Sequence, residues 1–135
     1  MATFTLEVIT QERSVVLADV EYVLLPGVDG TFGILAGHLP IMASLGLGVL
    51  EFGPRQGKRR KIALGGGFVE MHDNKLTVMA HTAELAEEID VLRARQARMR
   101  AEQRLADRKA DLDIARAQVS LQKALLRLKV ADGDQ

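Results

Sequence analysis

Apolar and polar residues alternate along the first half of the chain. At its start, Phe4, Leu6 and Val8 are separated by Thr5 and Glu7, which is the period of two expected for a strand with one buried face. Further apolar runs follow at short intervals: Val15–Leu25, Ile41–Leu45, Gly48–Phe52, Lys61–Leu64, Phe68–Met71 and Leu76–Ala80. The turn-forming stretches GPRQGK, GGG and HDNK separate the later runs. Many short strands joined by turns predict an antiparallel sandwich or barrel rather than βαβ units.

The second half has the spacing of helices instead. Apolar residues recur at intervals of three and four in two stripes, Ala94, Ala97, Ala101 and Leu105, then Ile114, Ala117, Leu121, Leu125 and Leu128. Asp111 and Asp113 are candidates for capping the second helix, since an aspartate oxygen accepts from free amides of a first turn. Small facing residues would let two antiparallel helices pack closely. Because residues 89–131 contain neither glycine nor proline, the sequence permits both a folded hairpin and an extended arm.

Glycine, proline and net charge also differ between the two halves of the chain. Eleven of the 12 glycines and all three prolines lie between Pro26 and Gly67. The 18 basic and 18 acidic residues cancel, which argues against a global attraction to nucleic acid or acidic lipid. Residues 1–88 nevertheless carry 7 basic and 11 acidic residues, a net charge of −4, and residues 89–135 carry 11 and 7, a net charge of +4. With no cysteine, the chain has neither disulfides nor thiolate chemistry, and no apolar run approaches the length of a membrane span.

Residues suited to catalysis are few. His38, His72 and His81 are scattered without the spacing of a metal-binding motif, and no serine lies in a G-x-S-x-G context. Gly65–Gly67 lack the dinucleotide-binding fingerprint, so a turn or bulge between strands is the better interpretation. The sequence therefore favours a structural or binding protein over an enzyme, and no metal site is expected.

The basic half begins with EEIDVLRARQARMR, residues 87–100, which contains four arginines. These could form a solvated helix face, a nucleic-acid-binding arm or a phosphate pocket. A nucleic-acid-binding module would be expected to offer aromatic stacking residues or a basic sandwich face. The tail has no aromatic residue and the first half is net acidic, so a nucleic-acid-binding module using the arginine-rich helix is only the alternative hypothesis.

Three motifs occur in an order that resembles one protein family. They are PGVDGTFGILAGHLP at residues 26–40, GGGFVEM at 65–71 and IDVLRA at 89–94, ahead of a helical tail rich in alanine and arginine. Together they resemble the epsilon subunit of bacterial F-type ATP synthase, from about Phe4 to Val130. The resemblance implies an α+β chain, with an antiparallel β-sandwich of about ten strands at residues 1–84 and a two-helix antiparallel hairpin at residues 85–135.

The resemblance also implies a function in which the chain itself catalyses nothing. Members of this family are rotor subunits of the central stalk, where they bind the gamma subunit and the membrane rotor ring and couple proton flow to ATP synthesis. Their extended tail reaches the alpha and beta catalytic subunits and inhibits ATP hydrolysis, whereas the hairpin is permissive. Thr31 and His38 are then expected to contact the rotor ring. The sandwich face that carries Gly65–Gly67 and Phe68 is expected to contact the gamma subunit. The whole subunit is expected on the cytoplasmic face of the bacterial cell membrane.

Some bacterial members bind ATP in the hairpin state through the motif I/L-D-x-x-R-A. The resemblance implies a nucleotide site made here by Ile89, Asp90, Arg93, Ala94, Glu84, Arg100, Lys123 and Arg127. Asp90 and Glu84 would bind the adenine amino group or ribose hydroxyls, and Ile89 would pack on the base. No cofactor is required for function, and ATP is a candidate regulatory ligand.

Helix periodicity agrees with a phosphate site in the hairpin. Arg93 and Arg100 are seven residues apart, and Lys123 and Arg127 are one turn apart, so each pair shares a helix face. If the two faces meet, four cations converge, which a triphosphate would stabilise. Lys123 stands where the family normally has arginine, and lysine lacks the bidentate donor geometry of a guanidinium. The affinity for ATP is therefore expected to be reduced.

Overall fold

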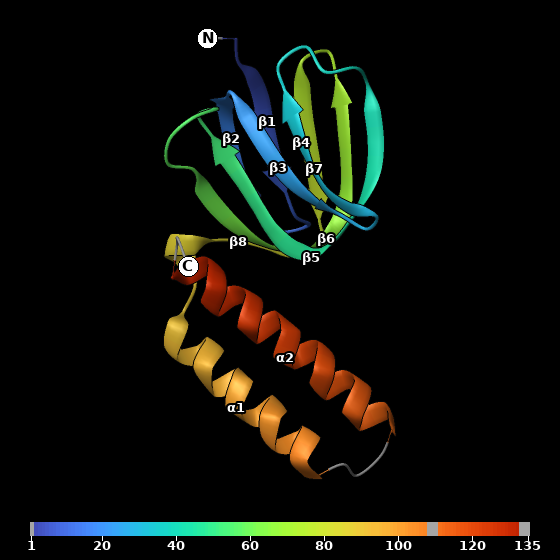
Figure 1. The fold of residues 1–135 in the computed structure, drawn as a ribbon, viewed down its shortest axis with the longest axis vertical. Helices are drawn as coiled ribbons and strands as arrows, with labels where there is room; N and C mark the ends of the chain where they lie inside the picture. The colour runs from blue at the N-terminus through green and yellow to red at the C-terminus, as the bar shows by residue number, and fades with distance from the viewer. Residues whose placement is uncertain (1, 108–110, 133–135) are drawn as a thin grey trace. The chain divides into compact units, whose positions relative to one another are not determined.

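The computed structural model describes residues 2–107 and 111–132, apart from the side chains of residues 111 and 112. The chain forms two compact units, Met1–Leu85 and Ala86–Gln135. The first unit is built of strands and the second of helices (Figure 1). The α+β plan predicted from the sequence, a β-sandwich followed by a helical hairpin, is confirmed.

Eight strands make up the first unit. They are β1 Phe4–Ile9, β2 Ser14–Val20, β3 Tyr22–Gly27, β4 Gly30–Leu35, β5 Ile41–Gly53, β6 Arg60–His72, β7 Lys75–Ala80 and β8 Ala83–Leu85. Their order in the sheet is β2-β1-β7-β6-β5-β3-β4, and β8 pairs with β6. The pairing is antiparallel except between β1 and β7, which run parallel. The sheet is therefore mixed, with a single parallel neighbour pair among the described strands.

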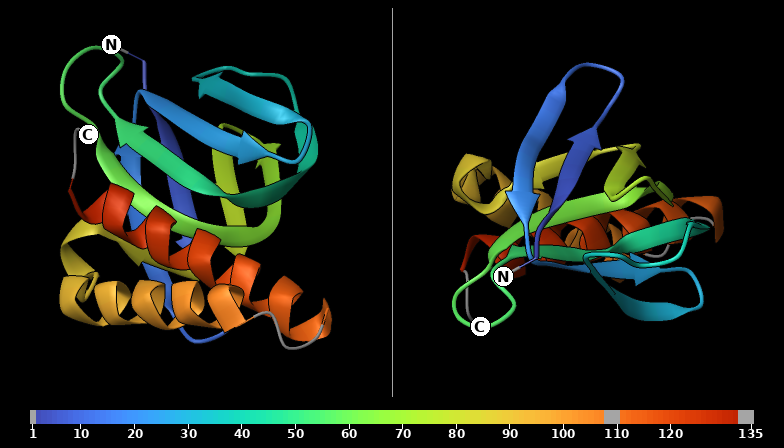
Figure 2. Two further views of the ribbon diagram at one scale, coloured as in Figure 1. Left: turned by 60° about the horizontal axis from the view of Figure 1, so that its bottom comes forward. Right: turned by 90° about the horizontal axis from the view of Figure 1, so that it is seen from above.

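The long strands β5 and β6 turn this sheet into a sandwich. Each has 13 residues, and they pair with one another along most of their length. The first part of β6 pairs with β8 and the last part with β7, so β6 takes part in both layers. Both strands curve strongly (Figures 1 and 2). The bend in β6 falls at Gly66 and Gly67, whose φ angles of 83° and 140° suit glycine and few other residues.

Large apolar side chains fill the space between the layers. Phe4, Leu6 and Val8 on alternate positions of β1 are all buried, as the period of two predicts. Many of the largest fully buried side chains come from the other strands, among them Leu25, Ile34, Leu50, Ile62, Leu64, Met71 and Leu76. The sandwich thus has one continuous core to which both long strands contribute.

Several strand boundaries differ from those read from the sequence. The runs Ile41–Leu45 and Gly48–Phe52 belong to the single strand β5, and Lys61–Leu64 and Phe68–Met71 belong to β6. Gly65–Gly67 therefore form a bend within β6, not a turn between strands. The run Val15–Leu25 divides into β2 and β3. The runs thus give six strands, and β4 and β8, which no run predicted, bring the described strands to eight, where the resemblance implied about ten.

The second unit contains the short 3₁₀ helix η1, Ala86–Glu88, and the helices α1, Val91–Asp107, and α2, Asp111–Ala131. The two long helices run antiparallel and lie side by side (Figures 1 and 2). Asp111 is the first residue of α2 and Asp113 lies inside the helix, so Asp113 is not its cap and the capping hypothesis for Asp111 stays a prediction. The hairpin is one of the two tail conformations that the sequence permits.

Small side chains line the contact between the helices. Among the side chains that the structure describes in the hairpin helices, the buried ones are Ala94, Ala101, Ala117, Ala124 and Val130. The predicted stripe on α2 is wrong at Leu125, whose side chain is 42% exposed, because Ala124 takes the inward position beside it. Leu121 and Leu128 are half-buried, so they flank the contact.

Candidate functional site

Asp90 caps the N-terminus of α1. Its Oδ1 accepts the backbone N–H of Arg93 at 3.0 Å, and its backbone carbonyl accepts the N–H of Ala94, also at 3.0 Å. An aspartate in this position satisfies an amide that the first helical turn leaves without an intrahelical partner. Asp90 therefore has a structural role in the chain whether or not it binds a ligand.

Ile89 and Ala94 flank this cap and are both buried. They occupy the residue before the cap and the fourth residue of the helix, the two positions that pack together in a hydrophobic staple. Three residues of the I-D-x-x-R-A motif thus help to start α1 and pack it. Arg93 differs from them, because its side chain is exposed.

Helix geometry places the four predicted phosphate-binding cations on one side of the hairpin. Arg93 and Arg100 each precede a buried alanine of α1, and Lys123 precedes the buried Ala124 of α2. In two antiparallel right-handed helices, residues that precede inward positions lie on the same side of the pair. Arg127, three residues after Ala124, also lies on this side and is half-buried.

The four cations are not evenly spaced along the hairpin. Ala94 lies 13 residues before the end of α1 at Asp107, and Ala124 lies 13 residues after the start of α2 at Asp111, which puts the two alanines at one level. Arg93 then lies level with the stretch from Lys123 to Arg127. Arg100 lies seven residues, about 10 Å, further along α1. The hairpin therefore groups Arg93, Lys123 and Arg127 and leaves Arg100 two turns away.

Glu84 comes from the other unit. It lies in β8, where it is half-buried and opposite Ala63 of β6 in the register. Glu84 therefore lies in a different unit from the other residues of the predicted nucleotide site.

A hollow of about 390 Å³ lies in the hairpin among residues that the sequence analysis did not select. Its lining includes Arg104, Asp107, Asp113 and Arg116, two cations and two anions. In the sequence, this hollow could have been predicted only from the charged residues that precede and follow the connection between the two helices. Asp113 was instead considered as a helix cap. Among the described lining residues the charges are balanced, whereas Arg93, Lys123 and Arg127 are all cations.

The two residues predicted to contact the rotor ring lie at opposite ends of β4. Thr31 is the second residue of the strand and pairs with Pro26, whereas His38 lies in the loop that follows it. Both are exposed. Next to His38, Leu39 is 78% exposed and Met42 is 70% exposed. The segment that carries His38 thus also exposes two large apolar side chains that the sequence analysis did not single out.

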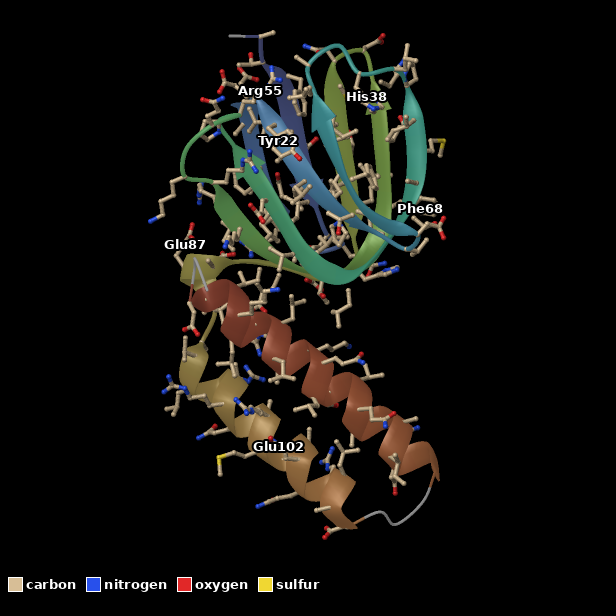
Figure 3. The ribbon with its side chains drawn as sticks, viewed as in Figure 1. Tyr22, His38, Arg55, Phe68, Glu87 and Glu102 are labelled. Atoms are coloured by element: carbon tan, nitrogen blue, oxygen red, sulfur yellow. The ribbon has the colours of Figure 1, made fainter. Side chains whose placement is uncertain are left out.

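A second exposed apolar surface lies on β6 and β7. Phe68 is 51% exposed and Met79 is its neighbour in the strand pairing. They line a hollow of about 350 Å³ together with Ile9, Thr10, Gln11, Gly67, Ala80 and His81. Figure 3 shows Phe68 well away from His38, which lies near the end of the sandwich that carries the N-terminus. The sandwich therefore presents two separate apolar surfaces.

Close packing explains the glycines beside Phe68. A Cβ on Gly67 would collide with the backbone carbonyl of Met79, and one on Gly65 would collide with the hydroxyl of Thr82. The close approach of β6 to β7 thus requires Gly67, whereas Gly66 is favoured by its positive φ angle.

Other kinds of site find no support in the part of the chain that the structure describes. In residues 2–107 and 111–132, His, Asp and Glu side chains form no group of three that could hold a metal ion. None of the helices in these ranges has the length and apolar character needed to cross a membrane.

Comparison with known proteins covers both units. Residues 3–86 match the beta-sandwich domain of the ATP synthase delta/epsilon chain, and residues 87–132 match the long alpha-helix domain of the same chain. The ATP synthase epsilon chain of Symbiobacterium thermophilum is 48% identical over 132 residues, covering 97% of this chain and 94% of that protein. The epsilon chain of Nitratidesulfovibrio vulgaris is 47% identical over 125 residues, covering 93% and 92%.

A solved structure has the same fold. A chain in the Euglena gracilis mitochondrial ATP synthase, in a structure of OSCP, F1 and the c-ring, aligns with a TM-score of 0.79 at 22% identity. The alignment covers 97% of this chain and 82% of that one. Both family domains and the full-length relatives agree with the resemblance carried by the three sequence motifs. The chain therefore belongs to the epsilon-chain family of ATP synthase subunits.

Proposed function

We propose that the chain is a non-catalytic rotor subunit of the central stalk, which links the gamma subunit to the membrane rotor ring. The observation that carries this proposal is the pair of separate apolar surfaces on one rigid sandwich. Exposed apolar patches of this kind mark sites of protein interaction. The surface at His38 and Leu39 faces the ring, and the surface at Phe68 and Met79 contacts gamma. The chain then sits peripherally on the cytoplasmic face of the bacterial cell membrane and takes part in coupling proton flow to ATP synthesis.

Single charges introduced on each surface test this assignment. Leu39→Asp is expected to weaken binding to the purified rotor ring and to leave gamma binding unchanged, because a carboxylate is costly to bury in an apolar contact. Phe68→Asp is expected to have the opposite selectivity. If both variants bind both partners as the unaltered chain does, the two-surface assignment is wrong.

The hairpin supplies the regulatory part of the proposal. Its helices meet through alanines, while Leu92 and Leu125 point away from the contact and are exposed. A contact of this kind needs little free energy to open, and opening would also expose the half-buried Leu121 and Leu128 to another protein surface. The net charge of +4 on residues 89–135 favours acidic surfaces of the alpha and beta catalytic subunits. In the extended form the tail would inhibit ATP hydrolysis.

Removal of residues 89–135 tests the regulatory role in the assembled enzyme. The truncated subunit is expected to raise the rate of ATP hydrolysis and to leave assembly and proton-driven ATP synthesis largely intact. The rate is measured on reconstituted ATP synthase at equal subunit content. An unchanged hydrolysis rate would remove inhibition by the tail while leaving the stalk assignment in place.

We further infer that the hairpin binds ATP weakly through Arg93, Lys123 and Arg127, with Arg100 further along the same side. Calorimetric titration of the full chain with MgATP tests this. Arg93→Ala is expected to abolish the heat of binding, and Arg95→Ala is the matched control, since Arg95 follows Ala94 and lies on the other side of the hairpin. Lys123→Arg is expected to tighten binding about tenfold, the effect of roughly one added charge-assisted hydrogen bond. No heat with the unaltered chain at millimolar MgATP would exclude the ATP site.

A further inference from the structure

The tight turn between β6 and β7 contains an asparagine whose side chain reaches two other segments. Asp73 and Asn74 have φ angles of 51° and 59°, and His72 and Lys75 close the turn as a strand pair. Two successive positive φ angles are typical of the two-residue hairpin turns that favour asparagine. The turn geometry accounts for the backbone of Asn74 but not for the contacts of its side chain.

Those contacts use both ends of the side-chain amide. Asn74 Oδ1 accepts the backbone N–H of Gly37 at 3.1 Å, and Nδ2 donates to the backbone carbonyl of Thr3 at 2.9 Å. The backbone carbonyl of Asn74 also accepts the N–H of Thr5 at 3.1 Å. Asn74 thus joins the N-terminal segment, the loop of residues 36–40 and its own turn.

The loop of residues 36–40, hereafter the docking loop, carries His38 and Leu39. Within it, the N–H of His38 donates to the carbonyl of Leu35 at 3.2 Å, and Gly37 has a φ angle of 78°. These features shape the loop locally. The bond from Gly37 to Asn74 fastens it to the turn between two other strands, which is 37 residues away in the sequence.

A hollow of about 390 Å³ adjoins the docking loop and the same turn. It is lined by Pro40, Ile41, Met42, Glu70, Met71 and His72. The exposed Leu39 and Met42 and this hollow form one surface, and Asn74 lies in the turn next to it. The relative placement of the loop and the hollow therefore depends on how firmly the loop is held to the turn.

We propose that Asn74 is the positioning residue that holds the docking loop ready for the rotor ring. The inference rests on the proposed ring contact of this loop and deepens it. A loop held in its bound shape loses less conformational entropy on binding, so it binds more tightly with no added contact. Asn74 supplies this order from outside the loop, and its own side chain is not required to touch the ring.

Three substitutions distinguish the backbone conformation of the turn from the two side-chain hydrogen bonds of Asn74. Asn74→Gly keeps the positive φ angle and removes both side-chain bonds. Asn74→Asp keeps the acceptor for the Gly37 N–H and loses the donor to Thr3. Asp73→Gly makes the same change of residue type at the neighbouring turn position and leaves the amide of Asn74 in place. It also removes the exposed ion pair between His72 and Asp73, which contributes little.

Hydrogen exchange of the full chain tests the positioning itself. Asn74→Gly is expected to speed exchange of the Gly37 amide about fivefold, the effect of losing one exposed hydrogen bond. Asn74→Asp and Asp73→Gly are expected to leave that exchange within about twofold of the unaltered chain. Equal exchange in Asn74→Gly and the unaltered chain would overturn the proposal, because the loop would then be held by something else.

Binding to the purified rotor ring, measured with the gamma subunit present, tests the consequence. Asn74→Gly is expected to weaken binding about fivefold, and Asn74→Asp to restore it. A melting temperature recorded for each variant shows whether weaker ring binding results from a general loss of stability. If Leu39→Asp weakens ring binding and Asn74→Gly does not, the positioning role is wrong and the ring contact stands. If Leu39→Asp also has no effect, the ring contact itself is wrong.

Discussion

The two units of the chain bury side chains of very different size. The sandwich interior contains Phe4, Leu25 and Ile34 and many other large apolar residues. In the hairpin helices, four of the five residues whose side chains are described as buried are alanines. Full burial of a leucine or phenylalanine contributes about 1.5–3 kcal/mol, and each buried methylene about 0.8 kcal/mol. One chain therefore combines a firmly packed platform with a pair of helices whose mutual contact is weak.

This difference fits the two roles in the proposed function, in which the sandwich links two partners and the hairpin regulates. Surfaces that link two partners must keep a fixed geometry, and a continuous core provides it. A segment that changes between a hairpin and an extended arm must not be stabilised too strongly in either conformation. Alanine meets this requirement, since it has the best helix propensity and adds little at the interface. The helices can therefore remain helical when they separate.

The largest expected effect comes from emptying part of the sandwich core. Leu25→Ala removes a fully buried side chain of β3 and leaves a cavity, which typically costs 2–5 kcal/mol. The free energy of unfolding of the sandwich is measured by urea denaturation followed by exchange of its strand amides. Leu17→Ala is the control, because Leu17 is exposed and its truncation is expected to change the free energy of unfolding by less than about 0.5 kcal/mol.

If Leu25→Ala destabilised the hairpin amides as strongly as the strand amides, the units would unfold as one. The comparison between a platform and an independent hairpin would then fail. A loss of stability confined to the strand amides would support that comparison.

A larger side chain at the hairpin contact is expected to have a smaller effect. Ala101→Leu must push α1 and α2 apart, and overpacking of this kind typically costs 1–3 kcal/mol. The hairpin is then expected to open, with faster amide exchange in α2 and unchanged exchange in the strands. In the assembled enzyme the opened tail is expected to lower the rate of ATP hydrolysis.

Ala106→Leu gives the matched control, because Ala106 lies on the same helix and is exposed. It adds the same side chain with no overlap at the contact. Equal exchange rates in the two leucine variants would mean that the alanine contact does not limit hairpin opening.

The sequence predicted much of the fold because both periodicities are long and clear. The alternation at Phe4, Leu6 and Val8 identified a half-buried strand, and the spacing after Ile89 identified two helices. The boundaries within β5 and β6 were not predictable in the same way. The interior glycines of β6 were interpreted as a turn or bulge between strands, yet tertiary packing requires Gly67 to lie close to Met79. A glycine that bends a strand and one that ends it have the same local signal.

The candidate site was predictable only in part. The motif identified the residues at the start of α1, and helix periodicity predicted that Arg93 and Lys123 could share a side of the hairpin. The motif could not reveal that Asp90 caps the helix, since that depends on where α1 begins. Nor could the sequence identify Asn74, because its two partners are backbone groups of Thr3 and Gly37, which carry no side-chain signal.

The smallest expected effect concerns Asp90, where a structural and a ligand-binding role overlap. Asp90→Ala removes the cap and is expected to cost about 1 kcal/mol, seen as faster exchange of the Arg93 amide. Asp90→Asn keeps an oxygen at the cap, so exchange should stay near that of the unaltered chain. Calorimetry with MgATP then separates the two roles. A loss of ATP binding in Asp90→Asn with exchange unchanged would assign the carboxylate to the ligand. Retained binding in Asp90→Asn and loss only in Asp90→Ala would show that the motif needs its aspartate to start the helix.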